Sequence, residues 1–168
     1  LTLGAANPQS GDTARDAASA VRASLARHGI DTQGFAFENG AGLSRHERVT
    51  AAGLGEMLRA AQATPFWAEF ASLLPRPGGE GTLKQRLPAL AEQARFKTGT
   101  LNDVRALAGY LDAGGRRWAV VLIANRAGIS NAQLDQLLEA RQAGSDLALG
   151  GSLLDRFRQI EELDQVTG

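Results

Sequence analysis

The sequence contains no cysteine, no excess of charge of either sign and no long apolar run. The lack of cysteine excludes disulfide bonds and thiolate zinc sites. Lys and Arg total 18, as do Asp and Glu. This balance argues against nucleic-acid binding, which usually requires a basic surface. The strongest apolar run, from Trp118 to Ala124, has the length of a strand and falls far short of the ~20 residues that span a bilayer.

The amino terminus has no signal-peptide pattern. Because the chain starts at Leu1 and not at Met, this absence does not separate one cellular compartment from another. A length of 168 residues suits one domain or the larger part of one. With 43% hydrophobic residues, such a chain can bury a sizeable core without disulfides or metals.

The first half of the chain predicts mainly helices. Apolar residues at helical spacing indicate a helix over 13–28, with Thr13 and Asp16 as a candidate capping pair. A short strand is expected at Phe35–Phe37. Thr50 is a candidate cap for a second helix, and Pro65 for the first turn of a third. The expected buried stripe of that third helix contains Phe66, Phe70 and Leu73 or Leu74.

The second half predicts a small sheet. A short helix is expected over 82–87, ending near Pro88. Three strand candidates follow, at 93–101, 104–112 and 116–125, and their short connections favour antiparallel pairing. The third strand is apolar without alternation, so both of its faces should be covered.

One further helix is expected to cover this sheet. Ser130 and Gln133 form a capping-box pair at its start. The expected inner face carries Leu134, Leu137 and Leu138. The predicted fold class is therefore α/β in the α+β sense, with helices packed on an antiparallel sheet. Residues 144–151 are expected to form a linker and 153–166 a terminal helix.

The tripeptide Lys97-Thr98-Gly99, followed by Thr100, lies on the first predicted strand. Penicillin-recognising serine enzymes carry Lys-Thr-Gly on such a strand beside the active-site serine. Lysine supplies a positive charge, threonine a hydroxyl, and glycine a close approach of the substrate backbone. A given tripeptide occurs by chance in a chain of this length roughly 2% of the time. The tripeptide is therefore informative only if other segments match the same family.

Other segments of the sequence also resemble motifs of a known family. Glu38-Asn39-Gly40-Ala41-Gly42-Leu43-Ser44-Arg45 resembles the Asp-Gly-Ser-Gly-Leu-Ser-Arg stretch of the D-Ala-D-Ala carboxypeptidases and endopeptidases called class C low-molecular-mass penicillin-binding proteins. Leu73-Leu74-Pro75 and Gly81-Thr82-Leu83-Lys84-Gln85-Arg86 resemble the Leu-Pro and Gly-Thr-Leu-x-x-Arg segments of that family. Phe96 to Leu101 and Ala108-Gly109-Tyr110 resemble its Lys-Thr-Gly-Ser/Thr-Leu and Ala-Gly-Tyr/Phe strands. These blocks follow the order and spacing of the family.

The resemblance implies the later part of a penicillin-binding transpeptidase and β-lactamase-like fold. It also implies hydrolysis of peptidoglycan stem peptides through an acyl-serine intermediate, reactivity with β-lactams, no metal or cofactor, and an extracytoplasmic location. Lys97 and Thr98 would hold the terminal carboxylate of the peptide and assist proton transfer. Gly99 would admit the substrate, and the backbone N–H of Thr100 would be one oxyanion donor.

The sequence departs from the family in its serines. The family acylates a serine in Ser-x-x-Lys and uses a second Ser-x-Asn motif, and no serine of this chain fits either pattern: Ser10, Ser19, Ser24, Ser44, Ser72, Ser130, Ser145 and Ser152. Both motifs precede the first matched block in the family. We therefore expect residues 1–141 to be the carboxy-terminal part of a carboxypeptidase domain whose amino-terminal half is missing, with 142–168 a linker and terminal helix of unknown role.

Two other readings stay open. The chain could be a non-catalytic peptide-binding or structural domain derived from this fold. It could also be a relative of class A β-lactamases, although these share Lys-Thr-Gly and not the Gly-Thr-Leu-x-x-Arg block. The two histidines offer less support for a functional site than Lys97-Thr98-Gly99 does. Ser44 with His46 is a weak candidate for a nucleophile and base, and His28 is expected to be a contact at a helix carboxyl end.

Overall fold

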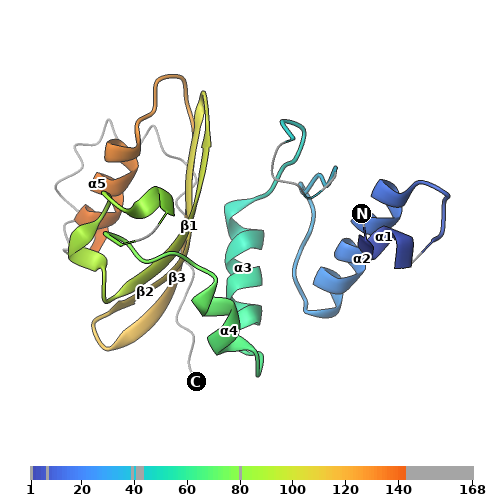
Figure 1. Ribbon diagram of the computed structural model, residues 1–168, viewed down its shortest axis with the longest axis horizontal. Coiled ribbons are helices and arrows are strands. Elements are labelled where there is room, and N and C mark those ends of the chain that lie inside the picture. The colour runs from blue at the N-terminus through green and yellow to red at the C-terminus, as the bar shows by residue number, and fades with distance from the viewer. Residues whose placement is uncertain (1, 7, 39, 41–43, 80, 143–168) are drawn as a thin grey trace. The chain divides into compact units, whose positions relative to one another are not determined.

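The computed structural model describes residues 2–6, 8–38, 40, 44–79 and 81–142. The chain divides into two compact units, Leu1–Ala60 and Ala61–Gly168, and each is described by itself. Figure 1 labels their helices and strands. The predicted linker over 144–151 and the predicted helix over 153–166 lie outside the described residues, as do positions 39 and 41–43 of the loop that resembles the family.

The first unit contains α1 (Thr2–Ala6), α2 (Thr13–Arg27) and most of α3 (Ala51–Gln62). The predicted helix over 13–28 is confirmed, but its predicted cap is wrong. The carboxylate of Asp12 accepts hydrogen bonds from the N–H groups of Ala14 and Arg15 at 3.0 and 3.2 Å. Asp16 instead accepts from the backbone of Gln9 and from Ser10, and these bonds lower its pKa.

The second predicted helix is confirmed as α3, where the Thr50 hydroxyl accepts from the N–H of Gly53 at 3.1 Å. The predicted strand at Phe35–Phe37 is wrong, because this segment makes only an isolated bridge between Ala36 and Arg48. Its aromatic side chains pack within the unit instead. The Phe35 ring lies so close to Gly53 that a Cβ there would be 2.5 Å away.

The second unit is built on a three-stranded antiparallel sheet in the order β1-β2-β3. The strands are β1 (Ala94–Leu101), β2 (Val104–Ala113) and β3 (Arg116–Asn125), which confirms the three predicted strands and their antiparallel pairing. Lys97 is paired with Ala108, which is paired in turn with Val121. Val121 and Leu122 point to opposite faces of β3 and are both buried, as its unbroken apolar run predicts.

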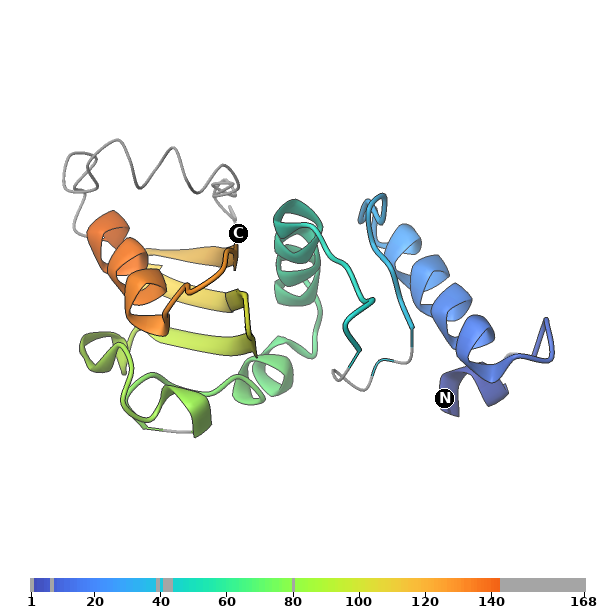
Figure 2. The same cartoon turned by 90° about the horizontal axis from the view of Figure 1, so that it is seen from above.

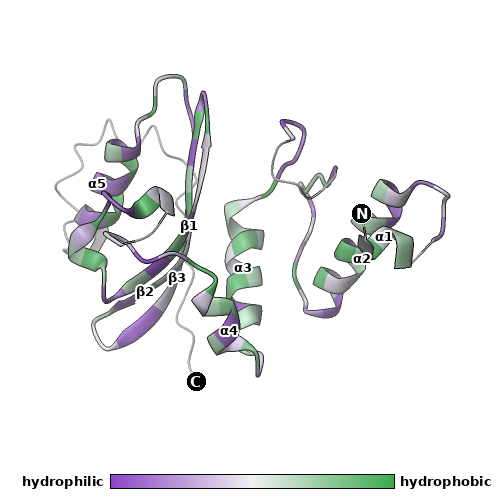
Figure 3. Ribbon diagram, in the orientation of Figure 1, coloured by the Kyte–Doolittle hydropathy of each residue, from purple (hydrophilic) through white to green (hydrophobic). Residues whose placement is uncertain are grey.

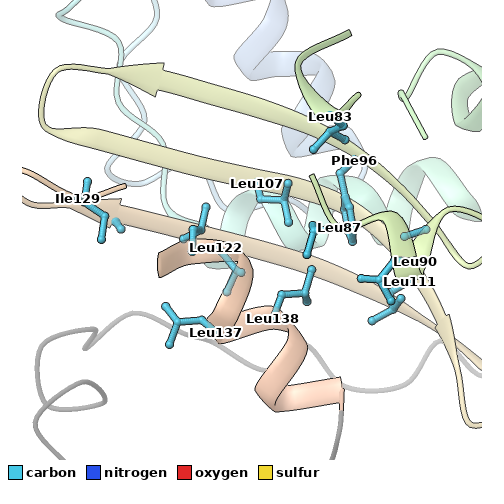
Figure 4. Packing of buried hydrophobic residues seen from close by; sticks show 13 residues of the cluster. Leu83, Leu87, Leu90, Phe96, Leu107, Leu111, Leu122, Ile129, Leu137 and Leu138 are labelled. Atoms are coloured by element: carbon cyan, nitrogen blue, oxygen red, sulfur yellow. The ribbon is translucent and has the colours of Figure 1, made fainter. Parts of the chain in front are cut away.

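Helix α5 (Asn131–Gln142) covers one face of the sheet, and Figure 2 shows this helix-on-sheet layering. The predicted capping box is present, since Ser130 N–H donates to the Gln133 side chain and Gln133 N–H donates to the Ser130 hydroxyl. Hydrophilic and hydrophobic residues both occur on this helix (Figure 3). Its apolar residues enter the core drawn in Figure 4, where Leu134, Leu137 and Leu138 join Phe96 and Leu107.

The segment that precedes the sheet differs most from expectation. It contains α4 (Trp67–Ser72) and two 3₁₀ turns, η1 (Gly81–Leu83) and η2 (Pro88–Leu90). The helix predicted over 82–87 is wrong, because only its first turn forms. Leu87, just before Pro88, has a left-handed backbone with φ of 51°, so the chain leaves the helical conformation there.

The predicted stripe of the third helix is only partly correct. Phe70 contacts Tyr110, with ring centroids 6.5 Å apart, but Phe66 and Leu73 are exposed. Trp67 packs edge-to-face against Tyr110, with ring centroids 4.5 Å apart. The guanidinium of Arg117 covers the Trp67 ring, 5.1 Å from its centroid, and binds Asp112.

Among the helices that the structure describes, none combines the length and the apolar character needed to cross a membrane.

Candidate active site

The candidate site lies along β1, which is an edge strand of the described sheet. The N–H of Phe96 points away from β2 and donates to the carbonyl of Pro75 at 3.0 Å. Backbone groups of a strand alternate in direction from one residue to the next. The N–H groups of Thr98 and Thr100, two and four residues further on, therefore face the same outer edge.

Lys97 approaches this edge through its long side chain. Its side chain leaves the opposite face of β1 from that of Thr98, because successive side chains alternate. The Nζ nevertheless donates to the carbonyl oxygen of Thr98 at 2.7 Å. Since that carbonyl faces outward together with the Thr98 N–H, the ammonium group lies at the outer edge of the strand. Lys97 is exposed, so its charge is available to an anion.

The hydroxyl of Thr98 is held by another hydroxyl. Thr98 is 8% exposed, and its Oγ1 lies 2.5 Å from the Oγ1 of Thr82. Gly99 follows without a side chain, and a Cβ built there would lie 3.3 Å from the Cβ of Ala106. The exposed Thr100 has the same side-chain direction as Thr98.

Several of the blocks noted in the sequence therefore meet at β1. Pro75 binds the backbone of Phe96, and Thr82 binds Thr98. Leu83, next to Thr82, is fully buried in the core of the unit. Gly109 allows β2 to approach β1, because a Cβ there would lie 2.1 Å from the carbonyl oxygen of Arg95. These contacts set the position of the Lys97-to-Thr100 edge.

Arg86, at the end of the Gly-Thr-Leu-x-x-Arg block, anchors this block to α5. Its Nε and Nη2 donate to the two carboxylate oxygens of Asp135 at 2.9 and 2.6 Å. The two side chains are only 12% and 14% exposed. A bidentate pair with so little solvent contact fixes the geometry of the segment that carries Thr82.

Replacing Arg86 with methionine is expected to lower the free energy of unfolding of the second unit by about 3 kcal/mol, because Asp135 is left charged and mostly buried. Urea denaturation followed by tryptophan fluorescence measures this change, since Trp67 and Trp118 both belong to this unit. Adding Asp135→Leu should restore much of the loss. Asp112→Asn, which breaks the more exposed pair with Arg117, should cost less than about 1 kcal/mol. Equal losses from the two breaks would contradict an anchoring role.

The low-ranked candidates lie in the first unit. His46 N–H donates to the Ser44 hydroxyl, while the His46 ring lies 3.3 Å from Glu38 and is not paired with that hydroxyl. Hydrogen bonds from Ser44 and His46 lower the pKa of Glu38. The predicted contact of His28 is present, because its Nδ1 lies 2.8 Å from the carbonyl oxygen of Ser24 at the end of α2.

The edge of β1 thus offers one ammonium group, hydroxyl groups and outward N–H groups, which together suit a carboxylate or a developing oxyanion. Within the described residues, no cluster of His, Asp and Glu could hold a metal ion. Sequence reasoning identified Lys97 to Thr100 but assigned no role to Thr82 or Arg86. The only signal for these two was their membership of a family block.

The sequence of this chain is similar to a known protein family and to individual carboxypeptidases. The profile of the D-Ala-D-Ala carboxypeptidase 3 (S13) family matches residues 2–146. The carboxypeptidase DacB of Mycolicibacterium smegmatis is 40% identical over 121 residues, which are 67% of this chain and 26% of that protein. A carboxypeptidase of Mycobacterium tuberculosis is 38% identical over 130 residues, covering 72% of this chain and 28% of the relative.

A solved structure agrees with these relatives. Penicillin-binding protein 4 of Haemophilus influenzae matches with a TM-score of 0.61 and 26% identity, over 70% of this chain and 27% of that protein. It matches equally well in its complex with a β-lactam. The chain therefore spans about a quarter of the length of these relatives. The matched blocks, the sheet and the family profile together show that this chain belongs to the D-Ala-D-Ala carboxypeptidase 3 (S13) family.

Proposed function

We propose that this chain forms one wall of the active site of a serine-type D-Ala-D-Ala carboxypeptidase or endopeptidase. The observation that carries the proposal is the position of the Lys97 Nζ against the outward carbonyl of Thr98 at the edge of β1, beside the Thr98 hydroxyl that Thr82 holds. A peptide that lies along this edge would place its terminal carboxylate near the ammonium group of Lys97 and the hydroxyl of Thr98. Gly99 would leave room for the peptide backbone.

The reaction requires groups that this chain does not supply. Attack on the peptide carbonyl needs a serine with a base within hydrogen-bond reach. The Ser-x-x-Lys and Ser-x-Asn motifs would come from the amino-terminal half of the family domain. The serine would form an acyl-enzyme, and water would then hydrolyse it. The outward N–H of Thr100 would stabilise the tetrahedral oxyanion together with the N–H of that serine.

The substrates of the complete site would be peptidoglycan stem peptides, and β-lactams would acylate the same serine. The complex of the Haemophilus influenzae relative with a β-lactam supports this assignment. The site would act on the cell-wall side of the membrane, where such peptides occur. It would need no metal or cofactor.

Without the nucleophile, the 168-residue chain is expected to form no covalent adduct with a fluorescent penicillin. The measurement is an in-gel fluorescence assay after denaturation, so that only covalent label remains. The full-length protein, in which this chain is joined to a Ser-x-x-Lys segment, should give a band that is lost when that serine is replaced with alanine. A labelled band from the 168-residue chain alone would contradict the proposal that it lacks the nucleophile.

A further inference from the structure

We propose that Thr82 is a positioning residue that directs the hydroxyl of Thr98 toward the substrate carboxylate. The two Oγ1 atoms lie 2.5 Å apart, although the residues are 16 positions apart in the sequence. This inference rests on the proposed function, in which Thr98 binds the carboxylate. It assigns a role to a residue for which the sequence suggested none.

The chemistry of two hydroxyls sets the direction of this bond. A threonine hydroxyl has one hydrogen to donate and two lone pairs to accept. An ionised carboxylate only accepts, so Thr98 must donate its single hydrogen to the substrate. Thr82 can then contact Thr98 only as the donor. The relay therefore runs from Thr82 to Thr98 to the carboxylate, and each bond strengthens the next.

The surroundings of the two threonines suit this role. Thr98 is buried and follows Phe96, which is fully buried, so its backbone is fixed by the core. Thr82 is exposed, but its neighbour Leu83 is fully buried and Arg86 binds Asp135. The segment that carries Thr82 is thus anchored, while Thr82 itself fills no core position. A change limited to its hydroxyl should leave the fold intact.

The test uses the full-length enzyme and two β-lactam probes, a penicillin with a free carboxylate and its methyl ester. Thr82→Val removes the hydroxyl and keeps the shape. We expect it to lower the acylation rate by the acid about fivefold and to leave the rate with the ester within about twofold of the parent enzyme. Thr82→Ser should restore the parent rate. Thr64→Val is the matched control, because its hydroxyl donates only to the carbonyl of Ala61. The acid-to-ester ratio does not depend on the fraction of folded enzyme.

The double variant Thr82→Val/Thr98→Val tests whether the loss of acylation rate in Thr82→Val arises through Thr98. If Thr82 acts through Thr98, the double variant should match Thr98→Val alone. A loss with Thr98→Val but none with Thr82→Val, or losses that multiply, would overturn the positioning role and leave the proposed function standing. An unchanged acid-to-ester ratio in Thr98→Val would overturn the proposed role of Thr98 and the inference with it.

Discussion

Replacing Lys97 with alanine is expected to lower the acylation rate of the full-length enzyme by about a hundredfold or more. The loss is large because the ammonium group of Lys97 lies at the outer edge of β1, where its Nζ binds the carbonyl of Thr98. Preorganised charges of this kind contribute strongly at sites where charge develops. The measurement is the second-order rate constant for acylation by a fluorescent penicillin.

Lys84 provides the control for this experiment. It is the other lysine of the sequence, it is exposed, and it lies in the block that carries Thr82. Lys84→Ala should keep the acylation rate within about twofold of the parent value, because a surface substitution of this kind removes no contact with the edge of β1. If Lys97→Ala caused no greater loss than Lys84→Ala, the chain would be better described as a non-catalytic domain that retains the sheet and helices.

Replacing Gly109 with alanine should lower the free energy of unfolding of the second unit by about 3 kcal/mol, at the upper end of the cost of overpacking a core. A Cβ at this position would lie 2.1 Å from the carbonyl oxygen of Arg95 and 2.9 Å from the Cα of Phe96. Both are backbone atoms, so no side-chain rotation can relieve the overlap. The strands must separate, and the edge that carries Lys97 must move with β1.

Urea denaturation followed by tryptophan fluorescence measures this loss. Gly79→Ala is the matched control, because a Cβ there would meet only the carbonyl of Arg76, at 3.9 Å. We expect that variant to unfold within about 0.5 kcal/mol of the parent chain. A Gly109→Ala variant as stable as the Gly79→Ala variant would show that β1 and β2 can separate at little cost.

Local patterns in the sequence predicted much of this fold. The three strands, their antiparallel order and the Ser130–Gln133 capping box rest on residues that are close in the chain. Local patterns gave wrong predictions where neighbouring residues favour different structures. Asp12 and Thr13 are both capping residues, and the structure uses Asp12. Aromatic residues at Phe35–Phe37 resemble a strand, but they pack against other parts of the first unit.

The sequence by itself determined the family blocks, the Lys97-to-Thr100 segment and the lack of a Ser-x-x-Lys motif. Only the tertiary structure decided how these parts meet. The hydroxyls of Thr82 and Thr98 are 16 positions apart, and Arg86 and Asp135 are 49 positions apart. Hydrophobic periodicity describes which face of an element is buried, but it carries no information on which distant side chain lies opposite. The packing of η1 and α5 against the sheet creates these contacts, and with them the arrangement of side chains along β1.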